Sequence, residues 1–152
     1  MNYWLVKSEP EAYSIDDLKR DKKIAWEGVR NYQARNFMRD SMKVGDKIIF
    51  YHSSATPPGA VGEARVCSLP YPDPSQFDAK SHYFDSKARK EKPIWYLVDI
   101  AFVRKFKRMV SLSEMRIHKE LSGMALLQPG SRLSITPVSE KEYTFVSTLS
   151  LE

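Results

Sequence analysis

The feature of the sequence that most constrains its fold is a long β-like run from Ile94 to Phe106. The run reads IWYLVDIAFVRKF, and its β-branched and aromatic residues favour a strand. Pro137 lacks an amide hydrogen, so the last β-like run is expected at a sheet edge or a strand end. Four shorter runs have a similar character and complete the set: Tyr3–Lys7, Lys47–His52, Gly59–Val66 and Arg132–Val138.

Three serines predict helix starts. Ser14 is followed by two aspartates, so it supplies a cap and acidic first-turn residues that suit the positive end of a helix dipole. Ser111 and Ser139 are each followed three residues later by a glutamate, Glu114 and Glu142. This is the pattern of a capping box, in which the serine oxygen and the glutamate carboxylate satisfy end amides reciprocally.

A fourth helix is expected from Asn31 to about Met42, because an asparagine side chain is a favoured cap. Gly45–Asp46 then turns the chain into the next strand. Apolar residues inside the helix recur at helical spacing and share one face: Ala34, Phe37, Met38 and Met42.

Strands and helices do not alternate along the chain, which argues against a parallel sheet with crossover helices. We predict a mixed α+β domain in which a small, curved, mostly antiparallel sheet or barrel carries short flanking helices. The chain has 152 residues, enough to bury a sizeable core without disulfides or metal. A single domain is therefore expected over residues 1–150.

One segment, Leu69–Pro93, departs from regular structure and contains four prolines and three aspartates. A long irregular excursion inside a compact domain is usually functional or mobile. It closes with a basic patch from Lys87 to Lys92. The sequence leaves open whether the excursion is a lid or a fixed part of the fold. Its aromatic residues indicate that it packs against the domain: Tyr71, Phe77, Tyr83 and Phe84.

The net charge and the cysteine content limit the classes of partner and the cellular compartment that we expect for this chain. The formal net charge is +5, which favours an anionic partner without identifying one. Cys67 is the only cysteine, so it cannot form an internal disulfide and is expected as a small core residue. The N-terminus does not have the pattern of a signal peptide, and no run approaches the roughly 18 apolar residues of a membrane helix. We expect a cytoplasmic monomer without membrane contact.

The sequence lacks the short motifs of phosphate loops, dinucleotide sites, zinc proteases and serine hydrolases. His52, His82 and His118 are far apart and have no CxxC companion, which argues against a zinc site. We therefore expect no metal, no cofactor and no catalytic residue, and we predict that the chain is not an enzyme.

The first candidate for ligand binding is the end of the first strand, where Lys7, Ser8 and Glu9 precede a proline. The lysine is a cation, the serine hydroxyl donates and accepts, and the glutamate accepts hydrogen bonds from base amino groups. The same residues also fit a solvated strand end with a charged pair.

The second candidate begins at Trp26, whose flat surface suits stacking on a base. Gly28 permits a close backbone approach, and the helix that begins after Asn31 has free end amides. Arg35 and Arg39 lie one turn apart on its polar face, where they are placed to meet phosphates. A core tryptophan, a capped helix and an ordinary charged face account for the same pattern.

Two further strand ends carry polar residues. Tyr51 and Ser53 share one face of a strand and His52 the other, so all three line one pocket only if the strand bends. A hydrogen-bonded structural histidine is the alternative for His52. Near the C-terminus, alternation places three polar residues on one face, which is either solvent or pocket: Arg132, Ser134 and Thr136.

Eight segments of the chain, taken in order, closely resemble EVE domain proteins. They are YWLVKSEP, WEGVRNYQARNFMR, KVGD, IIFYHS, PPGAVGEARV, YPDPSQFD, WYLVDI and RLSITPVS. The resemblance covers nearly the whole chain, from about Asn2 to Leu149. It implies a PUA-like fold, a pseudo-barrel of mixed strands wrapped by short helices. EVE domains are similar to YTH domains, which read methylated adenine, and to RNA-binding ASCH and PUA domains. The resemblance implies that this chain recognises a modified base in DNA or RNA.

The resemblance also implies a base-binding pocket. YTH domains have a strand ending in Lys-Ser and a later cage tryptophan, which Lys7, Ser8 and Trp26 match in type and order. Trp26 would stack on the base, and Ser8 and Lys7 would bond its edge or the adjoining backbone. The second cage tryptophan has no clear counterpart, because Trp95 lies in the long strand and is expected in the core. The other expected pocket residues are Glu9, Gly28, Val29, Arg30, Asn31, Tyr51, His52 and Ser53.

Phosphate contacts are expected from the helix-borne Arg35 and Arg39 and, on the excursion, from Lys87, Arg89 and Lys90. Three other functions use the same residues. The domain could sense a nucleotide metabolite, or bind a protein partner. It could also hydrolyse nucleic acid with His52 and Glu9 as general acid and base.

Overall fold

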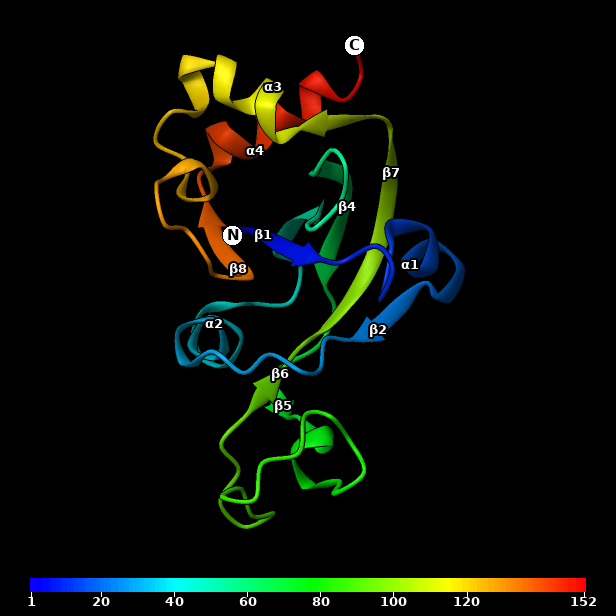
Figure 1. The fold of residues 1–152 in the computed structure, drawn as a ribbon, viewed down its shortest axis with the longest axis vertical. Helices are drawn as coiled ribbons and strands as arrows, with labels where there is room; N and C mark the ends of the chain where they lie inside the picture. The colour runs from blue at the N-terminus through cyan, green and yellow to red at the C-terminus, as the bar shows by residue number, and fades with distance from the viewer.

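The structure is a computed structural model that describes residues 1–152. Its main sheet has six strands in the order β2-β7-β4-β3-β1-β8 (Figure 1). Strand β1 runs parallel to β3, and all other neighbours in this sheet are antiparallel. The strands are β1 (Tyr3–Ser8), β2 (Lys23–Ala25), β3 (Lys47–His52), β4 (Gly59–Val66), β7 (Asp99–Ser111) and β8 (Ile135–Val138). The expectation of a mixed α+β fold with a mostly antiparallel curved sheet is confirmed.

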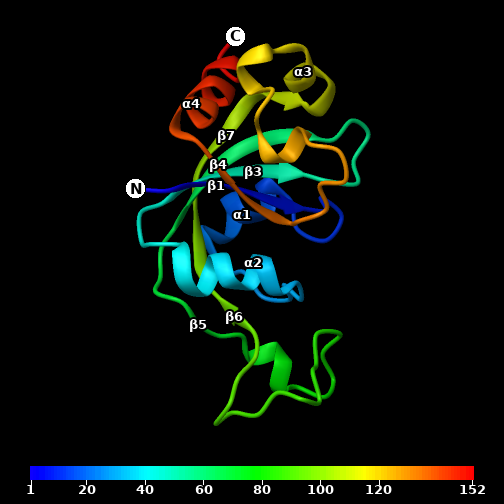
Figure 2. The same ribbon diagram turned by 90° about the vertical axis from the view of Figure 1, so that its left-hand side faces the viewer.

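Short helices flank the sheet. Helices α3 and α4 lie together at one end of the molecule, and α2 lies near its middle, between the main sheet and the segment around β5 and β6 (Figure 2). The helices are α1 (Ile15–Asp21), α2 (Tyr32–Asn36) with a π-helical continuation (Phe37–Ser41), α3 (Leu112–Ile117) and α4 (Glu140–Leu149). Three 3-10 turns cover Pro74–Phe77, Lys119–Leu121 and Ala125–Leu127. None of the helices is both long enough and apolar enough to cross a membrane.

Both faces of the central strands are buried. In β1, Trp4 and Val6 belong to a core shared with α1 and α2, whereas Leu5 belongs to a second core shared with α3 and α4. Strand β3 repeats the division, with Phe50 in the first core and Tyr51 in the second. Strands that are covered on both sides need apolar residues at successive positions, which explains their continuous hydrophobic runs.

The long predicted strand is divided in the structure. Tyr96–Leu97 forms β6, which pairs with β5 (Tyr71–Pro72) in a separate two-stranded sheet. The chain then enters the main sheet as β7, which extends to Ser111, beyond the predicted end at Phe106. Between the two strands, the Val98 carbonyl accepts a hydrogen bond from the Trp26 amide. The sequence does not reveal the division because both strands are rich in the same β-forming residues.

The helix caps follow the sequence closely. Ser14, Asn31 and Ser139 all cap helices, and Ser139 forms the full capping box with Glu142. Ser111 caps α3, but Glu114 does not complete the box, since its carboxylate binds Arg108 at 2.7 Å instead. The edge prediction is also confirmed, because β8, which contains Pro137, is the last strand of the sheet. This strand starts at Ile135 and not at Arg132.

The excursion Leu69–Pro93 extends from the end of the molecule opposite α3 and α4 (Figures 1 and 2). It folds around the two-stranded sheet and the 3-10 turn Pro74–Phe77. Within it the Gln76 side chain is fully buried and bonds the backbone of Asp73, Ile94 and Trp95. The excursion is therefore tied into one unit by its own polar contacts.

Cys67 lies just after β4 and differs from its prediction as a core residue. It is half-buried, and its amide donates to the carbonyl of Asp99 at 2.9 Å. Burial raises the pKa of its thiol. A raised thiol pKa lowers the thiolate fraction, which makes this cysteine a weak nucleophile.

Candidate functional site

A cleft of about 710 Å³ opens where β1 and β3 end. The two strands are parallel, with Lys7 opposite Tyr51 and Ser8 opposite His52, so both end at the same edge of the sheet. The Ser53 amide donates to the Ser8 carbonyl at 3.0 Å and holds the two strand ends together. The volume of the cleft lies within the range of small-ligand sites.

Most of the residues expected in a base pocket lie on this cleft. They come from the end of β1, the segment after β2 and the end of β3, which are distant in sequence. The residues in question are Lys7, Ser8, Glu9, Trp26, Gly28, Val29, Arg30 and Ser53. The fold thus brings together the first two candidate clusters of the sequence.

The Trp26 ring is half-buried and held by two other aromatic rings. Tyr13 and Phe50 contact it at close to right angles, with centroids 6.2 Å and 5.8 Å away. Edge-to-face contacts of this kind are favourable beyond the area that they bury. The ring therefore has a defined position on the cleft wall.

The indole N–H of Trp26 has no hydrogen-bond partner in the protein. The other two tryptophans satisfy theirs: Trp4 donates to Asp46 at 3.0 Å, and Trp95 donates to Asp85 at 2.8 Å. A buried or half-buried indole N–H usually finds an acceptor. Trp26 thus offers the cleft a free donor.

Lys7 is the second free donor of the cleft. Its side chain is half-buried, and its ammonium forms neither an ion pair nor a hydrogen bond with the protein. Burial lowers the pKa of this ammonium. Nearby, Ser8 is almost buried and donates its hydroxyl to the Tyr13 carbonyl at 2.5 Å, so its oxygen is left to accept.

Tyr83 reaches the cleft from the excursion and packs directly on Gly28. A Cβ atom at Gly28 would lie 2.6 Å from Tyr83 Cζ, and Gly28 has a φ of +91°. Glycine is thus required here both for the backbone conformation and for the close approach of the ring.

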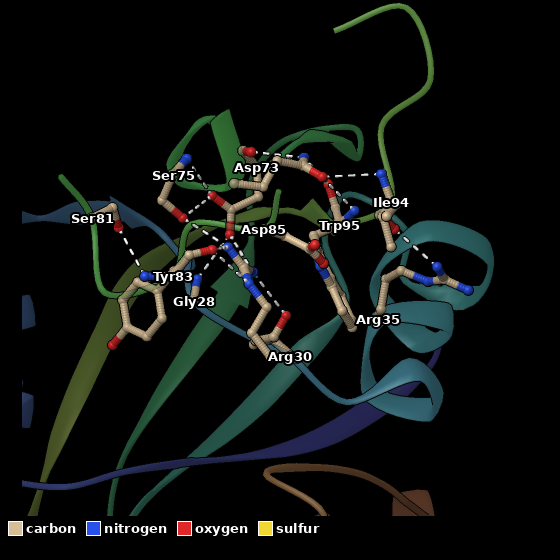
Figure 3. A network of polar contacts seen from close by, with 12 residues as sticks. Gly28, Arg30, Arg35, Asp73, Ser75, Ser81, Tyr83, Asp85, Ile94 and Trp95 are labelled. Carbon is tan, nitrogen blue, oxygen red and sulfur yellow. Dashed lines mark hydrogen bonds and ion pairs between the residues drawn. The ribbon is translucent and has the colours of Figure 1, made fainter. Parts of the chain in front are cut away.

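Arg30 connects the cleft to the excursion (Figure 3). Its guanidinium donates to the Tyr83 carbonyl, to Ser75 Oγ at 3.0 Å and to Asp73 Oδ2 at 3.1 Å. Asp73 is 1% exposed and also accepts from the Gly28 amide at 2.8 Å. Every guanidinium nitrogen of Arg30 is engaged within the protein, so Arg30 positions Tyr83 and is not a free cation.

Three of the expected pocket residues lie outside the cleft. Tyr51 faces the second core, as strand alternation from Phe50 requires, even though the pairing of β3 with β4 is bulged between these two residues. His52 Nε2 accepts the Ile15 amide at 3.1 Å at the start of α1, so His52 is a structural residue. Asn31 caps α2 and lines a different cavity.

The two helix-borne arginines are also occupied. Arg35 donates to the Ile94 carbonyl at 2.9 Å and lies over the Tyr32 ring at 4.8 Å. Arg39 forms an ion pair with Asp40 at 2.8 Å and lies 5.9 Å from the Tyr96 ring centroid. They hold α2 against the segment around β6, so they are not the free phosphate ligands that their spacing suggests.

The basic residues of the excursion are exposed and unpaired. Lys87, Arg89 and Lys90 form no side-chain hydrogen bond or ion pair. Arg132 at the cleft is exposed and free in the same way. Apart from Lys7 at the end of β1, these free cations lie on irregular segments and not on α2.

Sequence reasoning missed several residues that line the cleft. Tyr13 and Tyr83 carry no local signal, because only the tertiary fold brings them to Trp26 and Gly28. Arg132 and Ser134 did have a signal, the polar face before β8, which the structure assigns to the cleft wall. The remaining missed positions are Ala12, Ile24, Ala25 and Glu27. No group of three or more His, Cys, Asp or Glu side chains is placed to hold a metal ion.

Comparisons with known proteins agree with the observed fold. The family model described as EVE domain matches residues 2–149. Thymocyte nuclear protein 1 of Gallus gallus is 44% identical over 169 residues, which cover 99% of this chain and 69% of that protein. A crystal structure of a protein from Pseudomonas syringae superposes with a TM-score of 0.93 at 46% identity, covering 98% of this chain and 99% of that one. The crystal structure of human THYN1 in complex with 5-methylcytosine-containing DNA has a TM-score of 0.92 at 38% identity, covering 100% of this chain and 99% of that one.

Proposed function

Because this chain belongs to the EVE domain family, we propose that it binds nucleic acid and recognises a modified base, such as 5-methylcytosine, in the cleft beside Trp26. The structure of human THYN1 with 5-methylcytosine-containing DNA supports the choice of ligand. In this chain, the observation that carries the proposal is the pair of free donors, Lys7 Nζ and Trp26 Nε1, in one cleft.

The cleft has the features that base recognition needs. The Trp26 ring supplies an aromatic surface, and Ile24, Ala25 and Val29 add apolar wall. A methyl group buried against such a wall gains roughly 0.8 kcal/mol. The carbonyl oxygen of a pyrimidine can accept from the indole N–H, and the ammonium of Lys7 can bond the base edge or the adjoining phosphate.

The base has to leave the stack of a duplex to reach this cleft, or come from a single strand. Free cations that can meet phosphates of the same strand are Arg132 at the cleft and Lys87, Arg89 and Lys90 on the excursion. Binding through these cations releases counterions, so the affinity falls as the salt concentration rises. A free nucleoside in the same cleft would show a shallow salt dependence, which separates a strand binder from a metabolite sensor.

The hydrolytic alternative is not favoured by the geometry. Glu9 lines the cleft, but His52 is bonded to the α1 backbone and lies outside it. The two proposed acid–base partners thus have no shared cleft.

The relatives are named as nuclear proteins, whereas the cytoplasmic location and monomeric state expected of this chain stay predictions.

The test is binding of short labelled DNA and RNA strands, with and without 5-methylcytosine, at two salt concentrations. Wild type is compared with Trp26→Phe, which keeps a ring but removes the N–H, and with Trp26→Ala. We expect a preference for the methylated strand that weakens in Trp26→Phe and is lost in Trp26→Ala. The loss in Trp26→Ala is expected at about 5- to 150-fold, equivalent to roughly 1–3 kcal/mol of stacking per base.

Because Trp26 packs on Tyr13 and Phe50, each variant is first checked for its melting temperature and its backbone spectrum. Lys7→Met is expected to weaken binding of the methylated strand, because it removes the free ammonium from the cleft. Lys107→Met is its charge control, since Lys107 is exposed and does not line the cleft. A folded wild-type protein that binds no strand, or a methyl preference that survives in a folded Trp26→Ala variant, would overturn the proposal.

A further inference from the structure

A second cavity of about 490 Å³ adjoins the cleft of Trp26. It is formed between the start of α2 and the segment that leads into β8, which passes close to α2 in Figure 2. Arg132 lines both cavities, and it is the one residue that they share. The residues that line the second cavity include Asn31, Gln33, Phe37, Arg132, Thr136 and Pro137.

The second cavity carries two amide side chains with free groups. Gln33 is exposed and its side chain makes no hydrogen bond in the protein. Asn31 uses its Oδ1 to accept the Ala34 amide at 3.0 Å, which leaves its NH₂ group free. An amide side chain can bond the N6 and N7 atoms of adenine at the same time, so this chemistry suits the edge of a base.

A buried hydroxyl without a partner lies on the wall of the same cavity. Thr136 is 2% exposed, and its Oγ1 is the single buried side-chain nitrogen or oxygen atom of the chain that has no hydrogen bond. Such atoms are rare in native structures and call for a local explanation. Phe37 and Pro137 add flat apolar surface beside it.

Arg132 is free to bind an anion between the two cavities. It is exposed, forms no ion pair and makes no side-chain hydrogen bond. By contrast, Arg30, Arg35 and Arg39 are all committed to contacts within the protein. A phosphate that links two neighbouring nucleotides would meet the guanidinium of Arg132 if each nucleotide occupied one cavity.

We propose that the second cavity binds the nucleotide next to the modified base, with Gln33 and Asn31 reading its base edge and Arg132 binding the phosphate between the two. This inference rests on the proposed function of the Trp26 cleft. It makes the domain a reader of a short sequence context and not of an isolated base. Because two adjoining nucleotides have to be unpaired, the preferred form is a single strand or a locally opened duplex.

The experiment measures binding of 5-methylcytidine monophosphate and of single-stranded trinucleotides with central 5-methylcytosine and each base in turn at either flank. We expect one flank to prefer adenine by about 5- to 150-fold, as a good amide–adenine pair does. Gln33→Ala is expected to remove that preference without changing the affinity for the monophosphate. Both Gln33 and Arg132 are exposed, so their variants are expected to fold.

Arg132→Ala is expected to lower the salt slope for the single-stranded trinucleotides by about 0.7, the value for one lost phosphate contact to a single strand. Its control is Arg116→Ala, because Arg116 is also exposed and unpaired but lines neither cavity. Thr136→Val, which replaces the hydroxyl by a methyl group of similar size, is expected to keep its melting temperature and to weaken the trinucleotide more than the monophosphate.

Three results are distinguishable. A flank preference that is lost in Gln33→Ala, together with a reduced salt slope in Arg132→Ala alone, supports the second nucleotide site. Equal binding at every flank, with Arg132→Ala matching Arg116→Ala, overturns this site and leaves the Trp26 cleft intact. No binding of either the monophosphate or any trinucleotide by folded wild type overturns the proposed function and the second site with it.

Discussion

Arg30 donates two hydrogen bonds to the backbone carbonyl of Tyr83, from Nε at 3.1 Å and from Nη2 at 2.7 Å. Two residues that line the cleft, more than fifty positions apart in the sequence, are thereby joined (Figure 3). The same guanidinium is paired with the buried Asp73. The Arg30 side chain thus helps to fix the excursion to the cleft, so this contribution to binding can be tested by changing Arg30.

Arg30→Lys is expected to loosen the excursion and weaken binding of a methylated strand. Lysine keeps the charge but cannot reproduce the fork of donors that reaches Tyr83, Ser75 and Asp73 together. Breaking a largely buried pair costs about 3 kcal/mol or less when one partner is partly exposed. Hydrogen exchange is expected to rise around residues 73–85 while the main sheet stays protected. Unchanged exchange in that range would show that Arg30 does not hold the excursion.

Gly28→Ala is expected to displace Tyr83 from the cleft, because the new Cβ would lie 2.6 Å from Tyr83 Cζ. A positive φ by itself costs an alanine of the order of 1–3 kcal/mol. Gly45→Ala is the matched control, since Gly45 has a φ of +95° and its new methyl group would have no atom within 4 Å. Thermal unfolding should show the backbone cost in both variants and the added cost of displacing Tyr83 only in Gly28→Ala. Only Gly28→Ala should lose affinity for the methylated strand. If both variants bind the methylated strand equally well, the position of Tyr83 does not affect binding.

Binding is expected to weaken at alkaline pH as Lys7 loses its proton. Burial places the pKa of this ammonium below the ordinary value of 10.5, so the loss begins at a lower pH than for an exposed lysine. A bound phosphate or base oxygen stabilises the charged form, and binding therefore takes up a proton as the pH approaches the pKa of the free protein. Titrations at increasing pH check this in wild type and in Lys7→Met. A pH dependence that persists unchanged in Lys7→Met would assign it to another group.

Acid is expected to release the excursion before it unfolds the sheet. Burial opposes ionisation of Asp73, but hydrogen bonds from Ser75, Gly28 and Arg30 outweigh it and hold the pKa of Asp73 below the ordinary 3.8. A lowered carboxyl pKa adds stability above the ordinary value, and this stability is lost as the pH falls through the folded-state value. Spectra recorded between about pH 5 and about pH 2 should show early changes around Asp73. Asp73→Asn should remove the spectral change that occurs on acidification. Asp78→Asn should keep this change, because Asp78 is exposed and its carboxylate accepts no hydrogen bond from Arg30, Ser75 or Gly28.

Local signals in the sequence predict much of the fold. The caps at Ser14, Asn31 and Ser139 are correct because capping depends on groups within one turn of the helix. The strand Lys47–His52 is correct to the residue, since its β-forming residues are contiguous. The split between β6 and β7 escapes prediction because nothing local to Val98 marks the change of sheet. The extent of the domain, residues 1–150, stays a prediction.

The sequence predicts some of the residues that line the cleft and not others. Lys7, Ser8 and Trp26 are expected together from the sequence and lie on one cleft, although their binding roles stay predictions. Tyr51 is expected there but packs in the second core, because the strand alternates its side chains across a sheet that is buried on both faces. Tyr83 escapes prediction as a cleft residue, since its place depends on a contact with Gly28.

The sequence by itself determines the strands, the helix caps and the supply of cations and aromatic rings in this protein. These follow from propensities and hydrogen bonds that act over a few residues. Only the tertiary structure decides which of those groups are free. The side chains of Arg30 and Arg35 form hydrogen bonds within the protein, whereas those of Lys7 and Arg132 have no partner. Pairing depends on which segments the sheet and the excursion bring within hydrogen-bond distance, and that distance is a property of the folded chain.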